Sequence, residues 1–214
     1  MIRKFALALG GLILFYSLYL GWRIAEERRD VGARVDALIA AAAPDELSLP
    51  ASRLDALLRV DDPTFRTNRG IDLSTPGAGL TTLSQALGKR LFFDGFEPGL
   101  AKLELMVLTR FALYPKVPKD KVLTAFVAEA YLGTHRGRAV TGFADGAQTW
   151  FGKRLSDLSN DEYLSLVAML PAPDRLKPGR DDAARAERVT RIRRLLAGRC
   201  QPTGLRDVML EGCS

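Results

Sequence analysis

The stretch Asp61-Asp-Pro-Thr-Phe-Arg-Thr-Asn68-Arg-Gly-Ile-Asp72, taken with the segments after it, decides the fold. Two adjacent acids precede a loop rich in Pro and Gly, and loops on rigid scaffolds often carry catalytic residues. A carboxylate held on such a loop can act as a general base. The alternative is that Asp61 and Asp62 only cap a turn, because Asp before Pro is a common turn signal. The spacing of the downstream segments favours the first interpretation.

The next segment is Gly79-Leu-Thr81-Thr82-Leu-Ser84-Gln85-Ala86-Leu-Gly-Lys89-Arg90-Leu. Helical spacing of its apolar residues predicts a helix over 81–93. Short polar side chains at the start of a helix can bind sugar or phosphate oxygens. Ordinary helix capping by Thr is the alternative explanation of the same residues.

Further segments follow in order. They are Glu104, then Phe126-Val-Ala128-Glu-Ala-Tyr-Leu-Gly133, Gly142-Phe-Ala-Asp-Gly-Ala147-Gln-Thr-Trp150-Phe151-Gly-Lys153 and Leu158-Ser-Asn-Asp-Glu162 through Pro171-Ala-Pro173. In this order and spacing, the chain from about 58 to 196 resembles the glycosyltransferase domain of bifunctional penicillin-binding proteins and of monofunctional peptidoglycan transglycosylases.

The resemblance has gaps at positions that carry chemistry in the family. The first family motif, E-D-x-x-F-x-x-H-x-G-[IV]-D, is met without an insertion, but Asp61 replaces Glu and Asn68 replaces His. In the second, Ala86 and Arg90 replace Gln and Asn. The third, R-K-x-x-E, keeps only Glu104, with Leu100 and Ala101 at the basic positions. The fourth has Phe126 for Tyr and Ala128 for Asn.

The resemblance implies a mainly α, lysozyme-like helical glycosyltransferase domain with an N-terminal transmembrane helix. It also implies polymerisation of a lipid-linked disaccharide-peptide precursor into glycan strands, with Asp61 as the base. Aspartate is one methylene shorter than the family's glutamate, and a displacement of about 1 Å can cost about 100-fold in rate. The alternative is a catalytically impaired module that binds precursor or glycan, or that scaffolds a complex of cell-envelope proteins.

The same resemblance assigns the remaining site residues. Glu104 is expected to act in catalysis, either by orienting cations or by holding a divalent metal such as Mg²⁺ or Mn²⁺. Lys89, Arg90 and Lys102 are expected to stabilise the leaving pyrophosphate. The substrate-binding set is completed by polar residues of the first two motifs: Asp62, Asn68, Thr81, Thr82, Ser84 and Gln85.

The segment 5–22 carries no charge and is about long enough to cross a bilayer core of roughly 30 Å. A basic residue pair precedes it, but no small-residue cleavage site follows, which favours an uncleaved anchor over a secretory signal. We therefore expect a tip and anchor over 1–22, a juxtamembrane segment over 23–52, the transglycosylase-like domain over 53–198 and a Cys-containing tail over 199–214.

The location expected from the resemblance is the bacterial inner membrane, with a single span and the domain facing the periplasm. Charge alone does not settle the orientation, because arginines flank the apolar segment on its far side as well. The net charge of +6 suits an anionic membrane, a phosphate ligand or a nucleic acid. We expect no nucleic-acid partner, because few aromatic residues lie among the basic ones to stack on bases.

Periodicity and capping signals predict a succession of helices and no strand. The predicted ranges are 31–43, 53–59, 81–93, from Pro98 to about 111, 120–132, 144–151, from the Ser159–Glu162 capping box to Pro171, and 183–196. The last helix carries five arginines beside an apolar side. We interpret them as a solvated face, and contact with anionic lipid is the alternative.

The two cysteines, Cys200 and Cys213, both lie in the tail and are separated by a segment with Pro and Gly. A disulfide between them is compatible with an oxidising compartment. The alternative is two unrelated thiols, because counting cannot prove a pairing.

Overall fold

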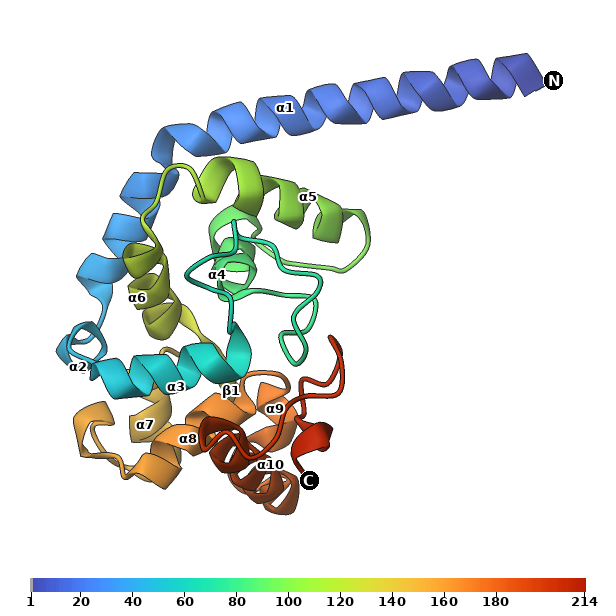
Figure 1. Cartoon of the computed structure of the whole chain (residues 1–214). Coiled ribbons are helices and arrows are strands. Elements are labelled where there is room, and N and C mark those ends of the chain that lie inside the picture. Colours follow the sequence, from blue (N-terminus) through green and yellow to red (C-terminus); the bar gives the residue numbers. More distant parts are fainter. Residues whose placement is uncertain (1) are drawn as a thin grey trace.

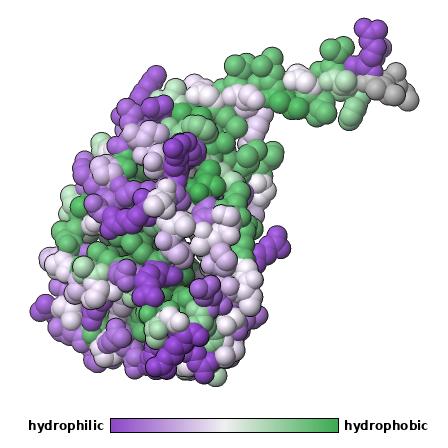
Figure 2. Space-filling model, in the orientation of Figure 1, coloured by the Kyte–Doolittle hydropathy of each residue, from purple (hydrophilic) through white to green (hydrophobic). Residues whose placement is uncertain are grey.

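The computed structural model describes residues 2–214 and begins with one long helix, α1 (Ile2–Ala41). Its first part stands clear of the domain, and the helix bends where it reaches the domain (Figure 1). Phe5 and Phe15 are each 72% exposed, whereas Val31 and Val35 are fully buried. By length and composition α1 can cross a membrane, and its projecting part is largely apolar (Figure 2).

The expected break between the anchor and a second helix at 31–43 is wrong, because α1 runs through both. The linking residues 23–30 are mostly charged residues, with one isoleucine and one alanine; most of them favour helix, and no proline interrupts the chain before Pro44. The helix therefore carries the chain directly from the apolar segment onto the domain.

Two short helices lead to the central loop. They are α2 (Pro44–Leu47) and α3 (Ala51–Asp61), with Asp62 as the C-cap residue of α3. The loop then runs to α4 (Leu83–Phe92). The two adjacent acids thus stand where a helix ends and the loop begins.

The part of the domain nearest the projecting helix contains α4, α5 (Leu100–Leu108), the π-helix η1 (Thr109–Leu113) and α6 (Lys119–Glu129). All four pack against α1 (Figure 1). Pro98 was expected inside the helix, but α5 starts at Leu100 with Gly99 as its N-cap residue. Gly99 has φ of 123°, which a side chain would strain, so the chain turns there and not at Pro98.

A two-stranded hairpin follows α6, which corrects the expectation of a chain without strands. β1 (Tyr131–His135) pairs antiparallel with β2 (Arg138–Thr141). Arg136 and Gly137 form the turn, both at positive φ. The register shifts between Tyr131 and Thr134, so no clean two-residue alternation marks the strands in the sequence.

The far part of the domain contains α7 (Phe143–Phe151), the 3-10 helix η2 (Leu155–Asp157), α8 (Asn160–Met169), α9 (Pro173–Leu176) and α10 (Asp182–Leu196). The Ser159–Glu162 capping box predicted for α8 is confirmed. α8 lies at the centre, with Tyr163 and Leu166 fully buried, and packs against α3, α7, α9 and α10.

The tail returns to the domain instead of extending from it. Cys200 and Cys213 are joined in a disulfide, and the 3-10 helix η3 (Glu211–Cys213) packs on α10. The segment before η3 passes beside the central loop (Figure 1).

Candidate active site

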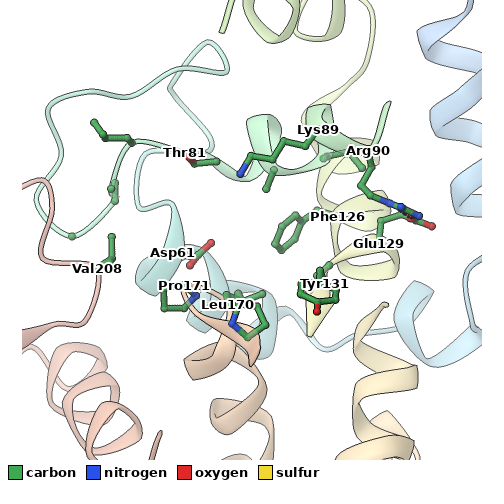
Figure 3. A pocket seen from close by; sticks show the side chains of 18 of the residues that line it. Asp61, Thr81, Lys89, Arg90, Phe126, Glu129, Tyr131, Leu170, Pro171 and Val208 are labelled. Atoms are coloured by element: carbon green, nitrogen blue, oxygen red, sulfur yellow. Dashed lines mark hydrogen bonds and ion pairs between the residues drawn. The ribbon is translucent and has the colours of Figure 1, made fainter. Parts of the chain in front are cut away.

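A pocket of about 520 Å³ lies between the two parts of the domain, and its walls come from distant segments of the chain (Figure 3). Asp61 at the end of α3, the loop residues 77–81, the middle of α4 and the end of α6 all line it. The turn after α8, Arg188 of α10 and Val208 of the tail complete the walls. Four of the motif segments quoted from the sequence, the first, second, fourth and last, therefore meet at one cavity.

Asp61 lines the wall of this pocket and is a half-buried residue. Burial raises the pKa of Asp61 to about 6, and the nearby positive charge of Arg188 opposes that rise. A carboxyl with this pKa is mostly ionised at neutral pH and can still accept a proton readily. Its position and its pKa both suit a general base.

Arg188 is a site residue that the sequence analysis missed. Its side chain is only 1% exposed, and its Nε and Nη1 atoms have no hydrogen-bond partner among the described residues. Burial lowers the pKa of Arg188 to about 10 against the opposing effect of Asp61. We interpreted the arginines of this helix as solvated, although Arg188 precedes the apolar Ile192 by four residues, which places both on one helix face.

Asp62 turns away from the pocket and is fully buried. Its Oδ2 accepts a hydrogen bond from the Leu83 backbone N–H at 3.0 Å, at the start of α4. Its Oδ1 accepts one from the Asn68 side-chain amide at 2.8 Å. Burial raises the pKa of Asp62 to about 6, opposed first by the hydrogen bond from Leu83. Through these hydrogen bonds Asp62 holds the central loop against the start of α4.

Asn68 also lies within the loop and does not line the pocket. Its Oδ1 accepts hydrogen bonds from the Gly70 backbone at 3.0 Å and from Lys119 Nζ at 2.9 Å. Two hydrogen-bonded neighbours and Asp62 thus hold its amide in a fixed orientation. This amide performs a structural task in the loop.

The four polar residues that open α4 divide into two groups. Thr82 caps the helix, and Gln85 completes a capping box with it, so the capping explanation describes this pair. Ser84 is likewise buried. Thr81 alone lines the pocket.

Three cationic side chains, those of Lys89, Arg90 and Lys102, lie near the pocket and differ in their contacts. Lys89 lines it, and burial lowers the pKa of its ammonium group. Arg90 lines it as well and donates from Nε and Nη2 to Glu129 Oε2, each at 3.1 Å. Lys89 is therefore the better placed of the two to meet an anion.

Lys102 reaches the loop from α5. Its Nζ donates to the Leu80 carbonyl at 2.6 Å, to Thr81 Oγ1 at 2.9 Å and to Gln85 Oε1 at 3.2 Å. Burial, and then the charge of Lys89, lower the pKa of Lys102 to about 8. Its charge stands directly behind the pocket wall formed by Thr81.

Glu104 does not line the pocket. Its side chain is buried against α1, where Oε1 accepts a hydrogen bond from the Tyr19 hydroxyl at 3.2 Å and lies 3.4 Å from Arg23 Nε. Among the described residues no three His, Cys, Asp or Glu side chains cluster as metal ligands would. The surroundings of Glu104 do not fit a divalent cation, and no step below uses one.

Comparison with known proteins agrees with this architecture. A family model described as Transglycosylase matches residues 42–197. Penicillin-binding protein 1B of Vibrio cholerae is 30% identical over 144 residues, which are 61% of this chain and 18% of that protein. Penicillin-binding protein 1B of Escherichia coli is 29% identical over 162 residues, 69% of this chain and 19% of that protein.

A shorter relative matches over most of its length. A Cupriavidus necator protein named "Putative transglycosylase" is 28% identical over 160 residues, 69% of this chain and 68% of that protein. The chain thus spans less than a quarter of the two penicillin-binding proteins and about two thirds of the shorter relative. With its mainly helical, lysozyme-like fold and a family match over most of its length, the chain belongs to the transglycosylase family.

Proposed function

We propose that this protein is a peptidoglycan glycosyltransferase that polymerises a lipid-linked disaccharide-peptide precursor. The observation that carries the proposal is the position of Asp61: a carboxylate on the pocket wall, with Arg188 beside it and Lys89 lining the same cavity. Family membership and the names of the relatives support the same chemistry.

In the proposed reaction, one bond forms and one bond breaks in the pocket. Asp61 takes the proton from an acceptor sugar hydroxyl, whose oxygen attacks the anomeric carbon of the donor sugar. A new glycosidic C–O bond forms as the bond from the anomeric carbon to the pyrophosphate oxygen breaks. The lipid pyrophosphate leaves with the bonding electron pair, and Asp61 holds the proton.

Charged side chains of the protein stabilise both the ionised base and the leaving pyrophosphate. Arg188 favours the ionised form of Asp61 before the reaction, because a positive charge nearby stabilises a carboxylate. Lys89 provides positive charge where the pyrophosphate develops negative charge, and Arg90 lines the same pocket. Such fixed charges in a partly dry site cost little reorganisation during the reaction.

The proposed location is the bacterial inner membrane with the domain in the periplasm. The apolar part of α1 would lie in the bilayer, where the lipid tail of the precursor also resides. The disulfide between Cys200 and Cys213 favours an oxidising compartment for the domain.

A second function, a module that binds precursor or glycan without polymerising it, is favoured by one specific observation. Glu104, the family's third-motif acid, is engaged by Tyr19 and Arg23 of α1, and Leu100 and Ala101 stand at the motif's basic positions. The pocket therefore has fewer cations than the family pattern provides for a leaving pyrophosphate.

A polymerisation assay separates the two functions. Detergent-purified protein is incubated with labelled lipid-linked disaccharide-peptide precursor and a divalent cation, beside an Asp61→Asn variant, and products are resolved on a gel. We expect polymer from the native protein and none from the variant. Bound precursor without polymer from the native protein would favour the binding module.

A further inference from the structure

The disulfide-closed tail, residues 199–214, contributes to the pocket although it lies beyond the family match, which ends at residue 197. Val208 lines the cavity, and Figure 3 places it on the opposite side of Asp61 from Arg90 and Glu129. The pocket is therefore bounded at that end by a segment outside the matched domain.

Backbone hydrogen bonds join the tail to residues 77–81 of the central loop, which line the pocket. The Gly77 N–H donates to the Gly204 carbonyl at 2.9 Å, and the Gly79 N–H donates to the Leu205 carbonyl at 2.8 Å. The tail approaches so closely that a Cβ at Gly77 would lie 2.6 Å from Pro202 and one at Gly79 would lie 2.7 Å from Val208. Both glycines also have positive φ, so the loop is shaped to receive the tail.

The tail is held from its other side by α10. Arg191 Nη1 donates to the Met209 carbonyl at 3.2 Å, and Arg194 Nη1 donates to the Cys213 carbonyl at 3.0 Å. Leu210 is fully buried. Within the tail, Asp207 accepts backbone hydrogen bonds from Thr203, Glu211 and Gly212.

From these contacts we infer that the tail is a wall of the binding site, held in place by the Cys200–Cys213 disulfide. The tail fixes residues 77–81 of the central loop. It also limits how far a sugar chain extends past Asp61. The disulfide joins the end of α10 to η3, so opening it releases a segment whose backbone supports the pocket loop. Only the identity of the ligand depends on the proposed function; the support of the loop does not.

The support of the loop is tested without ligand by amide hydrogen exchange in the full-length protein. Opening the disulfide, by reduction of the native protein or in the variant C200S/C213S, is expected to accelerate exchange at Gly77 and Gly79 by about tenfold or more. Amides of α8 should keep their protection in both samples, which shows that the domain is folded. Unchanged exchange at both glycines in the two samples would overturn the inference.

The wall itself is tested with labelled precursor and with short glycan strands. Val208→Trp should fill the end of the pocket and weaken binding of the glycan strands by about tenfold, as expected for an overpacked site. The matched control is Glu211→Trp, which adds the same ring to the tail at an exposed residue outside the pocket. Melting temperatures of both variants report on folding.

If native protein and folded Val208→Trp bind glycan strands with equal affinity, the inference that the tail is a wall of the binding site is wrong. A native protein that binds neither precursor nor glycan would instead contradict the proposed function. The exchange experiment would then still decide whether the disulfide holds the loop, so the two failures are distinguishable.

Discussion

Two acidic residues expected to act together, Asp61 and Glu104, have opposite surroundings. Each lies near one arginine, Arg188 for Asp61 and Arg23 for Glu104. Asp61 faces a cavity, whereas Glu104 is closed off by Tyr19 and Arg23 of the N-terminal helix. A motif match therefore predicts where a residue lies in the fold but not what its side chain contacts. Here the first-motif acid lies on the pocket wall, and the third-motif acid contacts α1.

The largest effect that follows from this comparison is expected from Asp61→Asn. Removing a general base costs roughly 100- to 10,000-fold in rate, so polymerisation should fall by that amount. The measurement is turnover of labelled precursor by detergent-purified protein. Asp55→Asn on the exposed side of the same helix is the control and should keep native turnover. A native rate in Asp61→Asn would remove Asp61 from the mechanism.

The pH dependence sharpens the role assigned to Arg188. A base acts in its ionised form, so with a pKa of about 6 for Asp61 we expect kcat/KM to be constant above pH 7 and to fall about tenfold per unit below pH 6. Arg188→Gln removes the charge that favours ionisation, which should move this fall to higher pH by about one unit or more.

The control for that pH profile is Arg193→Gln, an exposed arginine of the same helix that pairs with Asp161. Its profile should match that of the native protein. If Arg188→Gln lowers the rate equally at every pH, then Arg188 acts through the fold of the site and not through the charge of Asp61.

A smaller effect is expected from Lys89→Ala. Its ammonium lines the pocket, and a hydrogen bond from a charged donor contributes about 1.5–3 kcal/mol, so KM for the precursor should rise about tenfold or more. Lys116→Ala, an exposed lysine outside the pocket, is the control. Precursor binding can be followed by fluorescence anisotropy, and an unchanged affinity would place the pyrophosphate elsewhere.

The smallest effect on turnover is expected from Glu104→Gln. Because its carboxylate meets α1 and not the pocket, turnover should change by less than about threefold, while loss of the charge that Tyr19 and Arg23 contact should cost about 1.5–3 kcal/mol of stability. Turnover and thermal unfolding in detergent provide the two readings. A loss of turnover as large as that of Asp61→Asn would show that Glu104 acts in the reaction.

Much of the fold was accessible from the sequence because its signals are local. The capping box at Ser159 and the apolar spacing of α4 and α10 report on neighbouring residues, and the structure has helices there. The hairpin was missed because its register shift near Gly133 removes the two-residue alternation. The continuous α1 was missed because two separate apolar patterns were assigned to two helices.

The candidate site was less accessible because it depends on contacts between distant residues. Asp61 was found from motif spacing, but its neighbour Arg188 lies 127 positions later and resembles a solvated arginine in sequence. The partner of Glu104, Tyr19, is 85 residues away in a segment read as a membrane anchor. Charge patterns cannot reveal which arginine is buried.

The continuous helix α1 has a consequence for how the protein would meet its substrate. With its apolar part in a bilayer, the helix and the domain packed on its second part form one rigid unit, so the pocket would stay at a nearly constant height above the lipid headgroups. Encounters with precursor would then be a search in two dimensions, governed by lateral diffusion of lipid and protein. Inserting flexible residues at the bend would let the height of the pocket above the membrane vary. The rate of precursor binding would then fall even though every pocket residue is unchanged.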